Sequence, residues 1–147
     1  MRIDEIMSAI PHRYPFLFVD KVIEMDKDKI VALKNVSINE FYFQGHFPSY
    51  PLVPGVLQIE GIAQCAGILL LKNIENKEEI VPLFMGIEKA KFRSEVRPGD
   101  QMIYKVRVIG SKLNVCKLEG TVEVNGKLCT EAIITVGQKP MEEANDN

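Results

Sequence analysis

The residue best suited to proton transfer is a histidine in a proline-rich stretch. His46 lies in GHFPSYPLVPG, residues 45–55, beside the apolar residues Phe47 and Pro48. Such neighbours would partly remove water from the imidazole and favour its neutral form. A neutral histidine near physiological pH is the commonest general base, so His46 is the candidate base. The alternative is a surface or hydrogen-bonded loop histidine without a catalytic role.

A candidate acid follows in the apolar segment after the prolines. The neighbours of Glu60 are mainly apolar: Leu57, Ile59, Ile62 and Ala63. Burial without a nearby cation would raise the pKa of its carboxyl, and the protonated acid would be a proton donor. Gln64, four residues on, lies on the same helical face and could hydrogen-bond the acid or a water beside it, which makes it a further candidate substrate-binding residue. The alternatives are an exposed or helix-capping Glu60 and a solvent-facing Gln64.

Between the base and the acid, Pro54 and Gly55 mark the start of a helix. Unpaired amides at a helix start can hold an oxyanion, and a missing Cβ lets a substrate approach the backbone. Gly55 and Val56 are therefore candidate substrate-binding residues. The structural alternative is that Gly55 only permits the turn into the helix.

A base, an acid and an oxyanion site around one carbonyl suit a particular reaction. Together they can remove a proton α to the carbonyl and expel a β-leaving group, and a β-hydroxy thioester fits this chemistry. The spacing alone does not bring His46 and Glu60 face to face. Their placement depends on the elements that carry them.

The base and the acid are expected on different elements. Residues 39–55 contain three prolines and two glycines, which predicts a long irregular loop. Residues 56–74 are apolar almost all round, which is typical of a helix buried on most sides. Gly61 and Gly67 inside this helix each cost about 1 kcal/mol relative to alanine, which indicates close packing against a sheet.

The rest of the chain must enclose that helix. A short helix is expected over residues 3–9, and strands are predicted over residues 16–25, 30–38, 80–92, 101–110, 113–124 and 127–137. Asn125-Gly126 indicates a two-residue hairpin between the last two strands. The sequence thus predicts a single α+β domain over residues 1–140, with a central helix wrapped by a curved antiparallel sheet of five or six strands. Residues 141–147 are expected to be a frayed polar tail.

Composition and residue spacing argue against several classes of protein. The 147 residues carry a formal net charge of -2, which argues against a general nucleic-acid binder, and their longest apolar run is too short to cross a bilayer. The N-terminus does not resemble a signal peptide. Three cysteines without CxxC spacing are expected to be reduced core thiols in the cytoplasm. Neither histidine has a ligand-like partner, so no metal site is expected, and His12 is expected to pack or hydrogen-bond structurally.

The same residues resemble a known family. The string GHFPSYPLVPGVLQIEGIAQ (45–64), with IPHRYPFLFVD (10–20) and GIEKAKFRSEVRPGD (86–100), is similar to the hot-dog-fold β-hydroxyacyl-(acyl-carrier-protein) dehydratases of type II fatty acid synthesis. The likeness covers nearly the whole chain. The FabZ type is implied, because Glu60 stands where the FabA branch has aspartate.

The resemblance implies a reaction and an assembly. The reaction would convert (3R)-3-hydroxyacyl thioesters of acyl carrier protein to trans-2-enoyl thioesters and water, without cofactor or metal. His46 would take the C2 proton, Glu60 would protonate the C3 hydroxyl, and amides at Gly55 and the helix start would bind the thioester oxygen. Each site would combine the histidine and the acid of different subunits of a homodimer, with dimers grouped as a trimer of dimers.

One strand end is a candidate contact for the acidic carrier protein. Residues 88–97, EKAKFRSEVR, contain two acids and four basic residues, namely Lys89, Lys91, Arg93 and Arg97. The alternative is a solvated strand end. Phe92 in the same segment could line the acyl tunnel, although a core position is the favoured expectation.

Two other functions stay open. A hot-dog acyl-thioesterase would release a free thiol and would not need a histidine paired with a helix glutamate. A non-catalytic acyl-binding protein would keep the fold without activity. Acyl chain-length preference and residual isomerase activity depend on details of shape that the sequence leaves undetermined.

Overall fold

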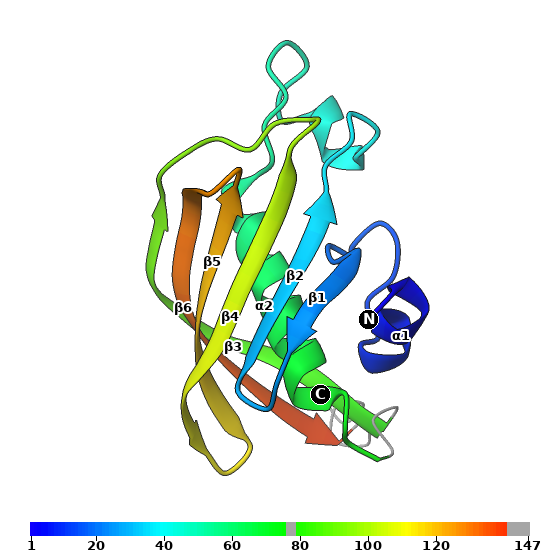
Figure 1. The fold of residues 1–147 in the computed structure, drawn as a ribbon, viewed down its shortest axis with the longest axis vertical. Coiled ribbons are helices and arrows are strands. Elements are labelled where there is room, and N and C mark those ends of the chain that lie inside the picture. Colours follow the sequence, from blue (N-terminus) through cyan, green and yellow to red (C-terminus); the bar gives the residue numbers. More distant parts are fainter. Residues whose placement is uncertain (76–78, 141–147) are drawn as a thin grey trace.

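The computed structural model describes residues 1–75 and 79–140 (Figure 1). Its helices are α1 (Ile3–Ala9), the 3₁₀ helix η1 (Phe41–Gln44) and α2 (Gly55–Leu71), and its strands are β1 (Lys21–Met25), β2 (Lys29–Asn35), β3 (Ile80–Phe92), β4 (Gln101–Lys112), β5 (Val115–Val124) and β6 (Lys127–Pro140). The strands form one antiparallel sheet in the order β1-β2-β4-β5-β6-β3. Strands β1 and β3 are therefore the two edges.

Helix α2 lies against the concave side of the curved sheet (Figure 1). Ten of its seventeen residues are buried, as expected for a segment that is apolar nearly all round. Gly61 and Gly120 mark where helix and sheet approach most closely. A Cβ on Gly61 would lie 2.3 Å from the hydroxyl of Tyr104 on β4, and one on Gly120 would lie 2.2 Å from Ile62 on α2. This architecture confirms the expected α+β hot-dog fold.

Several predicted boundaries need correction. The predicted strand over residues 16–25 is formed only by Lys21–Met25, because the backbone of Phe16 and Phe18 bonds to the Gln64 side chain instead of a neighbouring strand. The second strand ends at Asn35 rather than residue 38, and Ser37 enters a turn closed by Glu40. Helix α2 ends at Leu71, three residues before the predicted end.

Other predictions are confirmed. Asn125 and Gly126 both have positive φ, 50° and 78°, and connect Val124 to its partner Lys127, as a two-residue hairpin requires. Strand β3 has its predicted bounds. Gly67, by contrast, faces Ile10 of the N-terminal segment rather than the sheet. The predicted tail, residues 141–147, lies outside the described residues.

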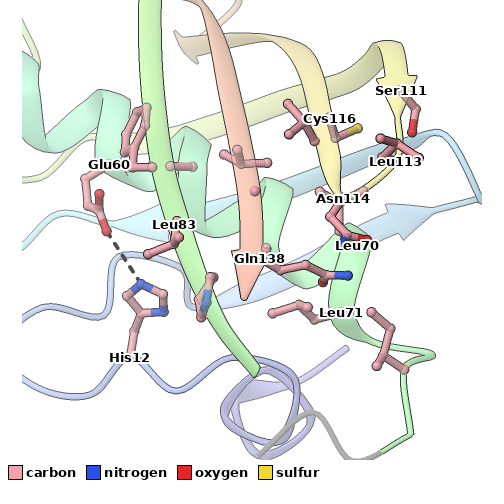
Figure 2. A pocket seen from close by; sticks show the side chains of 18 residues that line it. His12, Glu60, Leu70, Leu71, Leu83, Ser111, Leu113, Asn114, Cys116 and Gln138 are labelled. Atoms are coloured by element: carbon pink, nitrogen blue, oxygen red, sulfur yellow. Dashed lines mark ion pairs between the residues drawn. The ribbon is translucent and has the colours of Figure 1, made fainter. Parts of the chain in front are cut away.

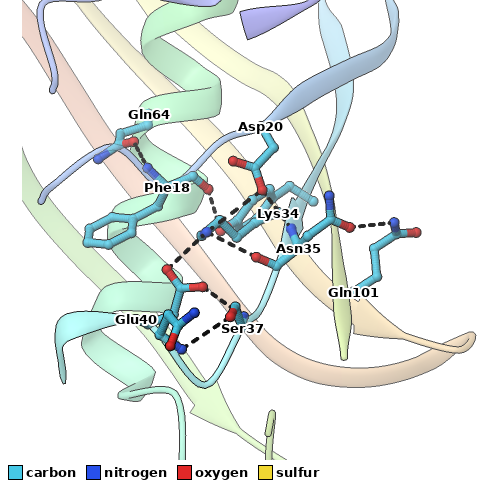
Figure 3. A network of polar contacts seen from close by, with 10 residues as sticks. Phe18, Asp20, Lys34, Asn35, Ser37, Glu40, Gln64 and Gln101 are labelled. Atoms are coloured by element: carbon cyan, nitrogen blue, oxygen red, sulfur yellow. Dashed lines mark hydrogen bonds and ion pairs between the residues drawn. The ribbon is translucent and has the colours of Figure 1, made fainter. Parts of the chain in front are cut away.

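A buried lysine organises the entry to the long loop (Figure 3). Lys34 Nζ donates to Glu40 Oε1 at 3.2 Å and to the carbonyl of Asn35 at 3.0 Å, and it lies 3.7 Å from Asp20 Oδ2. Glu40 Oε2 in turn accepts the Ser37 amide at 2.7 Å. Because a buried ammonium is costly unless paired, these contacts fix the chain just before η1. No helix in the described residues combines the length and apolar content that a bilayer crossing requires.

Candidate active site

The loop that carries His46 is held by its own backbone. The His46 amide donates to the carbonyl of Tyr42 within η1, and the Leu52 amide donates back to the His46 carbonyl. The Val53 amide donates to Val96, which joins the loop to the chain after β3. The loop between η1 and α2 is thus a fixed structure, and it projects beyond the sheet in Figure 1.

The hydrogen bonds of His46 define which ring nitrogen is available. Nδ1 lies 2.9 Å from the carbonyl oxygen of Leu52. A carbonyl only accepts, so Nδ1 carries the hydrogen and Nε2 of the neutral ring has a free lone pair. Phe47 stacks on the ring with centroids 4.2 Å apart, and the imidazole is partly buried, as its apolar neighbours predicted. This tautomer is the one a general base at Nε2 needs.

His46 shares a cavity with the start of α2. The cavity, of about 440 Å³, is lined by His46 together with Gly55, Val56 and Phe92. The Leu57 and Gln58 amides donate to the Pro54 carbonyl. The Gly55 and Val56 amides have no acceptor in the described part of the chain. The cavity therefore combines a free imidazole nitrogen with two amides able to bind an oxyanion.

Phe92 lies over the glycine at the helix start. A Cβ on Gly55 would be 2.4 Å from its ring, so only glycine leaves the ring this position. Phe92 is 54% exposed, which shows that the favoured expectation of a core position was wrong. Phe92 does line the cavity that holds His46, and its place in an acyl tunnel stays a prediction.

Glu60 occupies a different cavity (Figure 2). Its side chain is only 19% exposed, and burial raises the pKa of the carboxyl, as its apolar neighbours predicted. Gln64 Nε2 donates to Glu60 Oε1 at 3.2 Å, a contact that lowers the pKa and only partly offsets burial. The structure therefore has a mostly buried Glu60 carboxyl with a raised pKa, one turn before its predicted amide partner, and its role as an acid stays a prediction.

Gln64 is a buried structural residue as well as a neighbour of the acid. Its Nε2 also donates to the Phe16 carbonyl at 2.8 Å, and its Oε1 accepts the Phe18 amide at 2.7 Å. The alternative of a solvent-facing Gln64 is therefore wrong. These bonds fasten the segment after α1 to the middle of α2.

That fastened segment brings a second histidine to the acid. His12 Nε2 lies 3.7 Å from Glu60 Oε1, and both residues line the same cavity (Figure 2). Burial, with a smaller effect of the Arg13 charge, lowers the pKa of His12. Sequence reasoning gave His12 only a structural role. No spacing rule joins it to Glu60, although the apolar residues after it could have suggested that this segment packs on the helix.

The cavity beside Glu60 is mainly apolar. Its volume is about 290 Å³, and α2, β3, β5 and β6 supply most of the lining, including Leu70, Leu83, Cys116 and Val136. His46 does not line it. Within one chain, the candidate base and the candidate acid thus face separate cavities.

The basic residues near Phe92 are partly engaged. Arg93 pairs with Glu131 at 2.8 Å, and the Arg97 guanidinium lies 4.3 Å from the centre of the Tyr50 ring. Lys89 and Lys91 are exposed. In residues 1–75 and 79–140, no three His, Cys, Asp or Glu side chains gather in a way that could hold a metal ion.

Comparisons with known proteins agree on one family. Residues 10–133 match the model of the FabA-like domain. Among curated proteins, the chain is 55% identical over 139 residues to the 3-hydroxyacyl-(acyl-carrier-protein) dehydratase FabZ of Petrotoga mobilis, covering 95% of this chain and 99% of that protein. Its counterpart in Thermotoga maritima is 54% identical, with 95% and 98% covered, and that of Streptococcus agalactiae is 47% identical, with 90% and 94% covered.

Solved structures share the fold at low identity. The dehydratase heterocomplex ApeI:P from Xenorhabdus doucetiae matches with a TM-score of 0.79 and 16% identity over 99% of this chain and 96% of that chain. A hypothetical thioesterase with coenzyme A from Streptococcus pneumoniae matches with a TM-score of 0.62 and 11% identity, covering 93% of each. These likenesses concern the fold alone.

Proposed function

The chain belongs to the FabA-like family and is a hydro-lyase of the 3-hydroxyacyl-(acyl-carrier-protein) dehydratase type, and from this premise we propose how its residues perform the reaction. The substrate is a (3R)-3-hydroxyacyl group on the phosphopantetheine of acyl carrier protein, and the product is the trans-2-enoyl thioester. The observation that carries the proposal is His46, with Nδ1 bound to Leu52 and Nε2 free in a cavity that also holds the start of α2.

His46 acts as the general base. Its free Nε2 removes the C2 proton, and the negative charge that develops on the thioester oxygen is held by the Gly55 and Val56 amides. The electron pair left at C2 forms the C2–C3 double bond and the C3–O bond breaks. Leu52 keeps the ring in the required tautomer and stabilises the imidazolium that forms, since its carbonyl accepts the Nδ1 hydrogen in both states.

Glu60 acts as the general acid. Its raised pKa keeps a proton on the carboxyl at higher pH than an exposed glutamate would, and that proton passes to the departing hydroxyl, which leaves as water. The enzyme is left with an imidazolium and a carboxylate. Transfer of the proton from one to the other through solvent restores the resting state, so the overall reaction consumes no proton.

The complete site is formed by two chains. His46 and Glu60 face different cavities in one chain, and strand β3, an edge strand among the residues that the structure describes, exposes the large apolar side chains Phe84, Met85 and Ile87. An apolar sheet edge is suited to pairing with a second copy. In a two-fold dimer, each His46 would meet the partner's acid, which gives two identical sites. A trimer of such dimers is the proposed full assembly.

We propose that residues 1–140 form one hot-dog domain. We place the enzyme in the cytoplasm, a proposal that rests on the buried free thiols of Cys65, Cys116 and Cys129. Lys89 and Lys91 are proposed to contact the acidic carrier protein, because they are exposed beyond the cavity that holds His46.

A spectrophotometric assay tests the reaction. Hydration of a crotonyl thioester removes the enone absorbance in the ultraviolet, and we expect the wild-type protein to catalyse it without releasing thiol. His46→Ala and Glu60→Gln should each lower the rate by about 10²–10⁴, the usual contribution of a general acid or base. Release of free thiol without loss of the enone would favour the thioesterase, and unchanged rates in both variants would contradict the proposed roles.

A further inference from the structure

The carboxyl of Glu60 is contacted on one of its two oxygens only. Gln64 Nε2 donates to Oε1 at 3.2 Å, and His12 Nε2 lies 3.7 Å from the same atom. No polar partner for Oε2 occurs in residues 1–75 and 79–140. The two oxygens of the carboxyl are therefore in different environments.

The surroundings of His12 favour its neutral form. Nδ1 is buried and has no hydrogen-bond partner in the described chain. An imidazolium would place an N–H there without an acceptor, which is costly, so the ring keeps its one hydrogen on Nε2, toward Glu60. The Arg13 guanidinium is occupied by the carbonyls of Met7, Ile10 and His12, and its charge further lowers the pKa of His12.

This arrangement decides where the acid can carry its proton. A neutral carboxyl has one carbonyl oxygen and one hydroxyl. Both neighbours of Oε1 present N–H groups, so Oε1 is the carbonyl oxygen and the hydroxyl is on Oε2. Oε2 is the oxygen that His12 and Gln64 leave free.

We propose that His12 is a positioning residue for Glu60: the Gln64 amide bonds Oε1, and the N–H dipole of the neutral imidazole, 3.7 Å from the same atom, attracts it without a direct hydrogen bond, so that Oε2 presents the acidic proton to the substrate. This inference rests on the proposed role of Glu60 as the general acid. It extends that role to a residue outside the loop and helix that carry the base and the acid. The charge of His12 then matters, because a cation at this place would stabilise the carboxylate and remove the proton.

Few other groups can influence this carboxyl. The titratable side chains among the residues that line the cavity are His12, Glu60 and Cys116. Cys116 on β5 has a pKa raised by burial and is a neutral thiol. Gln64 carries no charge, and Arg13 follows His12 in the chain and binds backbone carbonyls. Changes at His12 should therefore act directly on the protonation of Glu60.

Three substitutions separate positioning from packing. His12→Phe keeps the ring and removes the N–H, His12→Gln restores a neutral N–H donor, and His12→Lys adds a cation. The kcat and KM of the intact protein are measured across pH with a 3-hydroxyacyl-carrier-protein substrate. The pKa of Glu60 is measured separately, from the pH titration of its ¹³C-labelled side-chain carboxyl by NMR.

We expect an ordered series. The pKa of Glu60, and with it the high-pH limb of kcat, should be lowest with Lys, intermediate and similar with His and Gln, and highest with Phe. His12→Phe and His12→Lys should lose about tenfold or more in kcat at neutral pH with little change in KM, the scale expected when a reacting group is misplaced. His12→Gln should retain most of the wild-type kcat.

The His12 variants and the Glu60→Gln variant test two different claims. An identical Glu60 pKa in the variants, with the His12→Phe kcat equal to wild type, would overturn the role of His12 alone. Full activity of Glu60→Gln would instead overturn the proposed function. If His12→Phe does not fold, comparison of His12→Gln with His12→Lys still decides the question, since both are flexible and polar and differ in charge.

Discussion

At the scale of the residue, the carboxyl of Glu60 combines a role as an acid with a cost to the fold. Burial favours its protonated form, so the folded protein holds this proton more tightly than the unfolded chain does. The free energy of unfolding should thus receive its full contribution from this group below the unfolded pKa. That contribution is lost as pH rises through the raised, folded pKa, because an ionised carboxylate must then remain buried.

Glu60→Gln should therefore stabilise the protein in a pH-dependent way. The amide keeps the shape without the charge, so the melting temperature of the variant should exceed that of wild type at pH 8. The difference should shrink toward pH 5, where more of the wild-type carboxyl is protonated. Thermal unfolding at several pH values measures this, and a difference that does not vary with pH would show that Glu60 carries no buried charge.

Sequence reasoning found the individual groups better than their contacts. The apolar helical neighbours of Glu60 predict a buried acid, and the spacing of four residues predicts Gln64 as its hydrogen-bond partner. The hydrogen bonds of Gln64 to the backbone of Phe16 and Phe18 are not predictable from the sequence, since a side chain that bonds to a distant backbone leaves no periodic signal. These hydrogen bonds bring His12 close to Glu60, so the sequence does not predict that contact either.

At the scale of the element, helix α2 was predictable and strand β1 was not. Apolar residues on nearly every side of α2, with Pro54 and Gly55 before it, indicated a buried helix. The predicted first strand began at residue 16 from its apolar composition, whereas a hydrogen bond to the helix competes with strand pairing for the amide of Phe18. Composition cannot tell which partner a backbone amide will find.

Gly61→Ala should destabilise the protein although it favours the helix. The new Cβ would lie 2.3 Å from the hydroxyl of Tyr104, a fully buried side chain fixed by its hydrogen bond to the Phe18 carbonyl. Overpacking typically costs about 1–3 kcal/mol, against a gain of about 1 kcal/mol in helix propensity. Chemical denaturation of the purified variant measures the free energy of unfolding.

Gly67→Ala provides the matched control in the same helix. Its Cβ would meet the Ile10 side chain at 3.3 Å, so the same gain in propensity is opposed by a much smaller displacement. We expect a change of less than about 1 kcal/mol in the free energy of unfolding. Equal effects of the two substitutions would contradict the close contact between Gly61 and the sheet.

At the scale of the whole molecule, the binding of acyl carrier protein should depend on the charged residues near the cavity that holds His46. Lys89→Glu with Lys91→Glu should raise the KM for acyl carrier protein substrates about tenfold while kcat changes little, because surface charges mainly affect encounter. The KM for a small pantetheine thioester should stay the same. Lys27→Glu with Lys29→Glu, in the β1–β2 turn and at the first residue of β2, is the charge-matched control, and an equal effect there would argue against a localised docking site.

The proposed assembly depends on features of the whole molecule, namely the two cavities and the edge strand β3. The resemblance implies that each site needs two subunits, and within one chain His46 and Glu60 line different cavities, so the two-subunit site stays a prediction. The edge strand β3 was predictable as a strand but not as a free edge, since strand order in the sheet depends on long-range pairing. Only the folded sheet reveals which strand lacks a neighbour.

Mixing two inactive variants tests the two-chain site most directly. His46→Ala and Glu60→Gln are each purified, then dissociated and reassembled together, and the dehydratase rate of the mixture is measured. Random pairing makes half of the dimers mixed, and each mixed dimer contains one intact site, so about a quarter of the wild-type rate should return. A mixture as inactive as its two components, with mixed dimers demonstrated by mass spectrometry, would contradict a site built from the histidine of one chain and the glutamate of another.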